Sequence, residues 1–158
     1  MNGKPLTARS CRVSVGHAEP TVHAGAVEDR DLLLLKQVVA SRLSGLKTEW
    51  LVPNKGWSGH VRISGASGFV GYLLTSPEWQ EARFEEPHLA MFLLTTADED
   101  DVIEALTRLA KIVASYVNGG AHLESRQRRF GRSEQILVVP TDEGDWRIGK
   151  RTTWHPIA

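Results

Sequence analysis

The clearest pattern in the sequence is a stripe of apolar residues at helical spacing between residues 98 and 117. Apolar side chains at every third or fourth position lie on one face of an α-helix, so this stretch predicts an amphipathic helix. Asp98 is placed to cap its N-terminus, with Asp101 in the position of a capping-box acid. Asn118 and the glycines after it are typical of a helix end. The stripe consists of Val102, Leu106, Leu109, Val113 and Tyr116, widened by Ile103, Ala110 and Val117.

An earlier helix is predicted to begin at Asp29 or Asp31 and to end near Ser44, where Gly45 provides a stop. Its apolar positions are more numerous than one face requires, so we expect burial on more than one side. The stripe consists of Leu32, Leu35, Val39, Leu43 and Leu46, broadened by Leu33, Leu34 and Val38.

Two apolar runs predict buried strands at Leu89–Leu94 and Ile136–Val139. A strand that is exposed to solvent on one face alternates between apolar and polar residues. An unbroken apolar run therefore indicates burial on both faces and a central place in a sheet. If the two strands are parallel neighbours, the helix between them forms a right-handed crossover. The polar stretch 121–130 and the alternating stretch Asp145–Thr153 flank the second run, and the three together predict a β-meander.

The region between the first helix and the first apolar run predicts a β-hairpin followed by a short helix. Val61 and Ile63 lie on one arm of the hairpin, Phe69–Leu74 forms the other, and Gly-Ala-Ser-Gly supplies the turn. Ser76 as a cap and Pro77 at the first helical position then predict a helix in the segment SPEWQEARF.

These elements predict an α+β fold, with a mostly antiparallel sheet, two main helices packed on one face and a C-terminal β-meander. The 158 residues suit one domain, which we expect to span residues 28–158. Residues 1–27 are poor in large apolar groups and predict a flexible N-terminal segment, in which Cys11–Val15 is a possible edge strand.

The segment VRISGASGFVG resembles the cofactor loop of the extended short-chain dehydrogenases. Gly65, Gly68 and Gly71 match that family's G-x-x-G-x-x-G pattern. The resemblance covers about 12 residues and implies a dinucleotide whose pyrophosphate lies at a helix N-terminus. The sequence departs from the family because Ser76 and Pro77 interrupt the required helix, and because no Tyr-x-x-x-Lys pair is present. A hairpin turn is the alternative interpretation of the same glycines.

Composition excludes several classes of protein. With 19 basic and 19 acidic residues, the chain has no overall attraction to nucleic acid or to an anionic membrane. Cys11 is the only cysteine, which excludes an internal disulfide framework and a multi-cysteine zinc site. The sequence has neither a secretory h-region nor an apolar run long enough to span a bilayer, so we expect a cytoplasmic protein without membrane contact.

The candidate catalytic and metal-binding groups are incomplete. Ser58 and Ser67 each miss the G-x-S-x-G pattern by one residue. His122-Leu123-Glu124 matches half of a zinc deaminase signature, but a single cysteine cannot supply the other half. Glu86 and His88 precede the first apolar run and are placed to meet at an edge of the sheet. We expect no cofactor and no metal, and whether the protein is an enzyme stays open, with the balance against it.

Three functional hypotheses remain. The leading one is a protein-binding module, such as a regulator, adaptor or immunity-type inhibitor, acting on a protein partner or on itself. Its candidate contact residues are Trp57, Trp79, Asp98, Glu99, Asp100 and Asp101. The second is nucleic-acid binding through the basic residues Arg126, Arg128, Arg129, Arg132, Lys150 and Arg151. The third is a small enzyme with a site near Gly65–Gly71 and His88.

Overall fold

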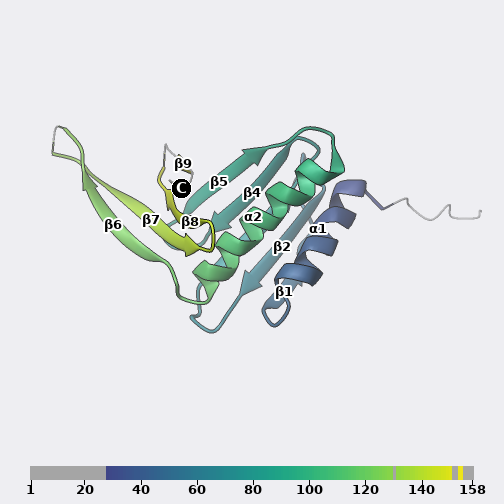
Figure 1. The fold of residues 1–158 in the computed structure, drawn as a ribbon, viewed down its shortest axis with the longest axis horizontal. Helices are drawn as coiled ribbons and strands as arrows, with labels where there is room; N and C mark the ends of the chain where they lie inside the picture. The colour runs from purple at the N-terminus through teal and green to yellow at the C-terminus, as the bar shows by residue number, and fades with distance from the viewer. Residues whose placement is uncertain (1–27, 130, 151–152, 155–158) are drawn as a thin grey trace, which may run out of the picture.

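A computed structural model describes residues 28–129 and 131–150, together with the backbone of residues 153–154. These residues form two antiparallel sheets and two helices (Figure 1). In chain order the elements are α1 (Arg30–Arg42), β1 (Lys47–Trp50), β2 (Gly59–Ser64), β3 (Val70–Thr75), β4 (Trp79–Phe84), β5 (Leu89–Leu94), α2 (Glu99–Val117), β6 (His122–Gln127), β7 (Ser133–Thr141), β8 (Gly144–Ile148) and β9 (Thr153–Trp154). The predicted strand at Cys11–Val15 lies outside the described residues.

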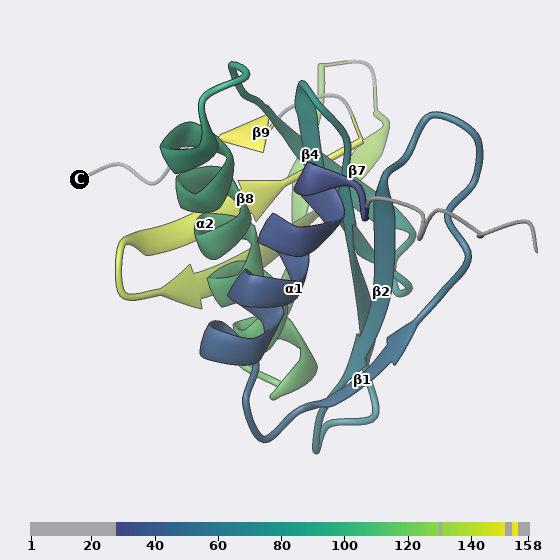
Figure 2. The ribbon, with the colours of Figure 1, turned by 90° about the vertical axis from the view of Figure 1, so that its right-hand side faces the viewer.

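The first sheet, called sheet A here, contains β1 to β5 in chain order, and each strand is antiparallel to the next. Both helices lie on the same face of sheet A, as Figure 2 shows from the side. The second sheet, sheet B, has the order β6-β7-β8-β9 and forms the C-terminal meander. The predicted α+β class, the helices on one face and the meander are therefore confirmed, although the strands divide into two sheets.

Helix α2 holds the core together because it packs against α1, sheet A and β7 of sheet B. Every residue of its predicted stripe is buried except Ile103, which is half-buried, and this confirms the helix and its orientation. Full burial of one large apolar side chain stabilises a fold by about 1.5–3 kcal/mol, so this stripe is a major source of stability. On the solvent side, Arg108 lies 3.2 Å from Glu104, one turn earlier, as its spacing predicts.

The acidic start of α2 caps the helix in a way that differs from the predicted capping box. The Asp98 side chain accepts a hydrogen bond from the backbone N–H of Asp100 at 2.9 Å. Asp101 does not reach back to Asp98 but accepts from the backbone N–H and the hydroxyl of Thr96, at 2.7 and 2.9 Å. These hydrogen bonds lower the pKa of the Asp101 carboxyl, which is solvent-exposed.

Helix α1 begins after the N-cap Asp29, whose side chain accepts from the backbone N–H of Asp31 at 2.9 Å. Leu34, Leu35, Val38, Val39 and Leu43 are buried. Leu33, expected to broaden the buried stripe, is 47% exposed. The helix lies on a sheet and beside α2, so two sides are covered and the side that carries Leu33 faces solvent.

The predicted hairpin is confirmed as β2 and β3, but the short helix predicted after it is wrong. Ser76 and Trp79 close a tight turn, since the backbone N–H of Ser76 donates to the Trp79 carbonyl at 2.9 Å. The Ser76 hydroxyl also accepts from the Trp79 N–H, so the serine caps a turn and not a helix. Pro77 suits the second position of such a turn as well as it suits a helix start. The residues that follow form β4.

The structure confirms the predicted central strand for one of the two apolar runs and contradicts it for the other. Ile136–Val139 lies in β7, which has neighbours on both sides and is buried along all four residues, so the prediction of a central strand is confirmed. Leu89–Leu94 forms β5 at the edge of sheet A and alternates between buried and exposed residues, so the prediction of a central strand buried on both faces is wrong. The two strands are not parallel neighbours, because they belong to different sheets.

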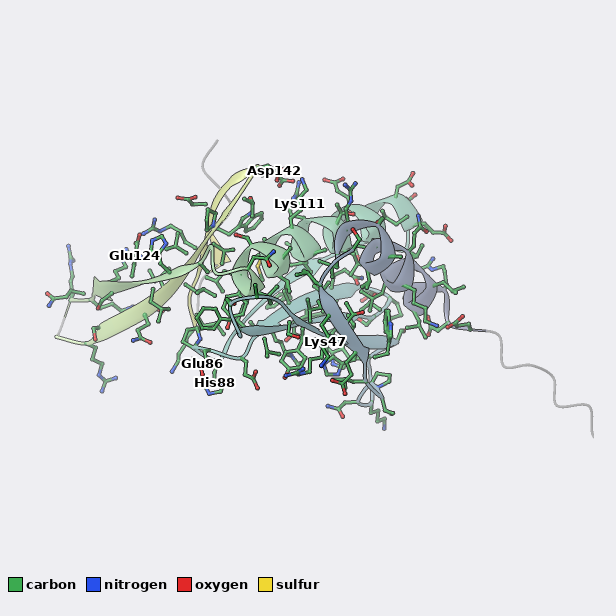
Figure 3. All side chains as sticks on the ribbon, turned by 90° about the horizontal axis from the view of Figure 1, so that it is seen from below. Lys47, Glu86, His88, Lys111, Glu124 and Asp142 are labelled. Atoms are coloured by element: carbon green, nitrogen blue, oxygen red, sulfur yellow. The ribbon has the colours of Figure 1, made fainter. Side chains whose placement is uncertain are left out.

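Sheet B contains β7 between β6 and β8, with the two-residue β9 beyond β8. Ion pairs join its β7–β8 turn to α2. The Nζ atom of Lys111 on α2 lies 3.0 Å from a carboxylate oxygen of Asp142 and 3.1 Å from one of Glu143 (Figure 3). Hairpin β6–β7 extends away from the helices (Figure 1). Neither described helix is long and apolar enough to cross a membrane.

Candidate functional site

The face of sheet A opposite the helices, called the outer face here, carries a cluster of aromatic and exposed apolar side chains. In β4 the buried residues Gln80, Ala82 and Phe84 face the helices, so the residues between them face outward. Across the register of β4 and β5, Trp79 is opposite Leu94, and Phe92 belongs to the same outward row. No described helix or strand covers this face, but the β1–β2 loop places Trp57 beside Arg83, and Leu74 of β3, which also faces outward, is 1% exposed.

Three side chains form the apolar part of the outer face. Trp79, Phe92 and Leu94 are 46%, 50% and 67% exposed. The rings of Trp79 and Phe92 lie with their centroids 5.2 Å apart. Aromatic rings in contact at a partly exposed site form a rigid apolar surface, which is typical of the centre of a protein interface.

A polar strip lies beside these apolar residues. The Nε atom of Arg83 lies 2.6 Å from a carboxylate oxygen of Glu81. The guanidinium of Arg83 also lies 5.8 Å from the ring centroid of Trp57, a residue of the β1–β2 loop. On β2 and β3, the rings of His60 and Tyr72 lie 5.6 Å apart. Burial, helped by the positive charge of Arg83, lowers the pKa of His60, so the imidazole is neutral at pH 7.

The structure places the predicted partner-binding residues at two locations. Trp57 and Trp79 both belong to the outer face, on either side of the Glu81–Arg83 pair. The acidic residues Asp98 to Asp101 lie at the N-terminus of α2, on the helix side of sheet A, where Asp98 caps the helix and Asp101 accepts from Thr96 just before it. The acids are therefore explained by helix formation, and the tryptophans form one surface.

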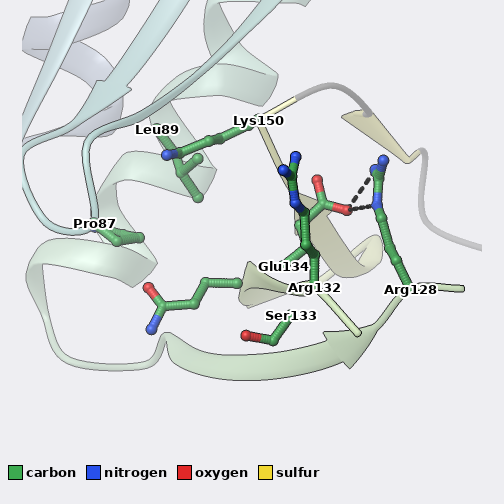
Figure 4. Close-up of a pocket in the computed structure, with 8 residues that line it drawn as sticks. Pro87, Leu89, Arg128, Arg132, Ser133, Glu134 and Lys150 are labelled. Atoms are coloured by element: carbon green, nitrogen blue, oxygen red, sulfur yellow. Dashed lines mark hydrogen bonds and ion pairs between the residues drawn. The ribbon is translucent and has the colours of Figure 1, made fainter. Parts of the chain in front are cut away.

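The basic residues form a second candidate site beside sheet B. Arg128, Arg132 and Lys150 line a hollow of about 480 Å³, together with Pro87, Leu89, Ser133, Glu134 and Gln135. Figure 4 shows Arg128 bonded to Glu134, with Arg128 Nε donating to a carboxylate oxygen of Glu134 at 2.7 Å. Lys150 extends toward Leu89. The backbone carbonyl of Arg132 accepts from the Arg128 N–H at 2.9 Å, but the side chains of Arg132 and Lys150 have no hydrogen bond or ion pair with another described residue.

The other basic candidates lie apart from this hollow. Arg126 and Arg129 belong to the outer part of hairpin β6–β7 and do not line it. Arg126 lies opposite Glu134 in the register, and Glu124 pairs with Arg147 of β8. Acidic residues therefore accompany the arginines along the hairpin. Arg151 lies outside the described residues.

Of the three glycines that resemble a cofactor loop, Gly65 and Gly71 pack against the end of α2, whereas Gly68 lies in the turn with open space around it and a φ of +81°. A Cβ added to Gly65 would lie 2.6 Å from the backbone oxygen of Val117, and one added to Gly71 would lie 2.8 Å from Val113. The Ser67 hydroxyl donates to the Val117 carbonyl at 2.6 Å, which satisfies one of the free carbonyls at the helix C-terminus. A strand, β3, follows the loop where the dehydrogenases have a helix. Close packing therefore explains Gly65 and Gly71, and the left-handed backbone conformation of the turn explains Gly68.

We expect Gly65→Ala to lower the free energy of unfolding by about 1–3 kcal/mol, because the new methyl group would meet a backbone oxygen that cannot rotate away. Urea denaturation of the full chain measures this. Ala66→Ser in the same turn is the matched control, and it should change stability by less than about 0.5 kcal/mol because Ala66 is exposed. Unchanged stability in Gly65→Ala, or a melting temperature raised by NAD, would contradict the packing interpretation.

The remaining candidate groups are not assembled into a catalytic centre within the described residues. Glu86 and His88 share the β4–β5 turn, but no hydrogen bond or ion pair joins them. His122 lies 3.5 Å from Glu124 on the exposed edge strand β6. In the part of the chain that the structure describes, no three histidine, cysteine, aspartate or glutamate side chains gather as metal ligands. Cys11 lies outside it.

Comparisons with protein-family models, with curated proteins and with solved structures gave no match. The outer face is therefore interpreted from its own chemistry. Sequence reasoning selected two of its residues, Trp57 and Trp79, and missed Phe92, Leu94 and Arg83. The signal was present in the alternation of WQEARF, in which Trp79, Glu81 and Arg83 share one face if the segment is a strand.

Proposed function

We propose that this protein is a protein-binding module whose partner docks on the outer face of sheet A. The observation that carries the proposal is the cluster of Trp79, Phe92 and Leu94, which is exposed at the β4–β5 part of the outer face. Exposed apolar side chains that occur singly are ordinary on protein surfaces, whereas a contiguous cluster marks an interaction site.

The chemistry of the face suits a protein partner. Its apolar centre is bordered by the Glu81–Arg83 pair and by Trp57, which gives a polar rim with one cation and one anion. Tryptophan and arginine are the residues that most often dominate binding energy at such interfaces. The rigid sheet also fixes the backbone beneath these side chains, so little conformational entropy is lost when a partner binds.

Nucleic-acid binding by hairpin β6–β7 is the alternative, and it has less support. The hairpin extends from the body of the protein and carries a cluster of arginines. However, Arg128 is bonded to Glu134, and Glu124 occupies the middle of β6. A phosphate backbone would meet these carboxylates together with the arginines, which weakens the attraction.

The proposal predicts that Trp79→Ala weakens binding at least about tenfold, because the indole is placed to be a buried anchor of the interface. The full chain carrying a photo-crosslinking amino acid at Glu81 would capture the partner in its host, and calorimetry with the purified partner would then give the affinities. Leu33→Ala is the matched control, because Leu33 is exposed to the same degree as Trp79 but lies on α1.

The control variant should bind as tightly as the unmodified chain. Both variants need urea denaturation curves, so that a change in binding is not confused with unfolding. Equal affinities for Trp79→Ala and Leu33→Ala would remove the outer face as the docking site.

A further inference from the structure

Within the described residues, one edge of β5 pairs with no other strand, although β8 of sheet B contacts β5 without pairing to it. The backbone N–H of Thr95 donates to the Glu78 carbonyl at 3.0 Å, which fixes the alternation of hydrogen-bonded pairs along β4 and β5. In an antiparallel ladder every second residue turns its N–H and C=O away from the neighbouring strand. In β5 those residues are Ala90, Phe92 and Leu94, and no described strand pairs with them.

This edge lacks the charged residues that protect the edges formed by β1 and β6. Edge strands usually carry charged residues that prevent pairing with a second chain. The outermost strands β1 and β6 follow that rule, with Lys47 and Glu49 in the first and Glu124 and Arg126 in the second. Strand β5, Leu-Ala-Met-Phe-Leu-Leu, has no charged residue in its six positions.

We infer that β5 pairs with β5 of a second copy of this chain, antiparallel and about a two-fold axis at Phe92. In that register Phe92 faces its own copy, and Ala90 faces Leu94 of the other chain. Each of the three residues then donates its N–H and accepts at its C=O, so that all unpaired groups of this stretch are satisfied. The two five-stranded sheets join into one sheet across the dimer.

A second copy fits this edge because the strand is uncharged and its exposed side chains are apolar. Antiparallel self-pairing brings no like charges together, and it places the two Phe92 rings side by side on the outer face, each next to a Trp79. The pairing starts at Ala90, since Leu89 lies in the hollow beside sheet B. A strand pair of this size buries less than the roughly 800 Å² per partner of a standard interface, so the dimer should dissociate on dilution.

The inference does not depend on the proposed partner. Sedimentation of the full chain over about a hundredfold range of concentration measures self-association, which follows mass action. We expect a monomer–dimer equilibrium that Phe92→Lys abolishes, because two ammonium groups would meet at the axis. Leu123→Lys is the matched control and should still dimerise, because Leu123 is exposed to the same 50% but lies on the edge strand β6.

Cysteine cross-linking tests the register in a Cys11→Ser background. Paired residues of this kind have Cα atoms about 5.5 Å apart, within the range that a disulfide spans, so Phe92→Cys should cross-link to its own copy under oxidation. Ala90→Cys alone should not, because its copy lies about four residues along the strand, roughly 13 Å away. Mixed Ala90→Cys and Leu94→Cys chains should cross-link to each other.

Three results would overturn the inference. They are a monomer at all concentrations, a dimer that Phe92→Lys leaves intact, and a Phe92→Cys dimer that does not cross-link. If the chain is a monomer and still binds its partner through Trp79, the second-copy inference fails and the proposed function stands. If the chain dimerises and Trp79→Ala binds the partner normally, the proposed function fails and the second-copy inference stands.

Discussion

Replacing Tyr116 with alanine is expected to lower the free energy of unfolding by about 3–5 kcal/mol, the range observed when a buried aromatic side chain is truncated. Tyr116 is 1% exposed and lies near the end of α2, where its ring contacts Phe69 and Phe84 at centroid distances of 5.2 and 5.0 Å. Its hydroxyl donates to the Glu86 carbonyl at 2.7 Å and accepts from the Glu86 N–H at 3.2 Å. The residue therefore joins the helix to two turns of sheet A.

Urea denaturation of the full chain measures this loss, which is a large share of the 5–15 kcal/mol that holds a typical domain. Tyr116→Phe separates the ring from the hydroxyl. It keeps the ring contacts and removes two hydrogen bonds, and it should lower the free energy of unfolding by about 1–2 kcal/mol. If Tyr116→Ala and Tyr116→Phe had equal effects, the ring would contribute no packing energy, and the assignment of Tyr116 to the core would be wrong.

Both helices could be predicted from the sequence because their signals are local. In α2 the apolar stripe, the acidic first turn and the glycines after Asn118 all agree, and the helix begins and ends where these signals place it. In α1 the stripe alone gave too wide a buried face, because Leu33 is apolar and yet lies on the exposed side. Apolar residues in a helix show that a face is buried, but they do not show how wide it is.

The strand errors have a different cause, since the position of a strand within a sheet depends on partners far away in the sequence. The run Leu89–Leu94 has the composition of a central strand, and nothing within it shows that one neighbour is absent. The turn at Ser76 and Pro77 uses the same two residues that open many helices, so the local signal favoured a helix. The alternating burial of β4 decides the matter, and it becomes visible only in the sheet.

The same limit explains why sequence reasoning missed Phe92 and Leu94 in the candidate site. Trp57 and Trp79 were selected because tryptophans beside turns are seldom fully buried, an argument from residue type alone. Phe92 and Leu94 were assigned to the core, because they belong to an apolar run whose edge position was unknown. The outer face and the free edge of β5 thus come from one fact, the place of β5 at the end of sheet A.

Replacing Gln80 with leucine is expected to lower the free energy of unfolding by about 2–4 kcal/mol, because it leaves buried polar groups without partners. Gln80 is a buried residue of β4, next to the turn that joins β3 to β4. Both the oxygen and the nitrogen of its side-chain amide form hydrogen bonds. Its carbonyl oxygen accepts from the Thr75 hydroxyl at 2.6 Å, and its amide nitrogen donates to the Ser76 carbonyl at 2.9 Å. Leucine has a similar volume, so the loss reports on these hydrogen bonds more than on a cavity.

A double-mutant cycle with Thr75→Val separates the two contributions. Valine removes the hydroxyl that Gln80→Leu leaves unpaired, so in the Gln80→Leu background it should cost less than it costs alone, or even restore stability. Urea denaturation of the four chains gives the coupling energy, which we expect to be at least about 1 kcal/mol for two buried groups in direct contact. Equal effects of Thr75→Val in both backgrounds would mean that the 2.6 Å hydrogen bond contributes nothing to the stability of the turn.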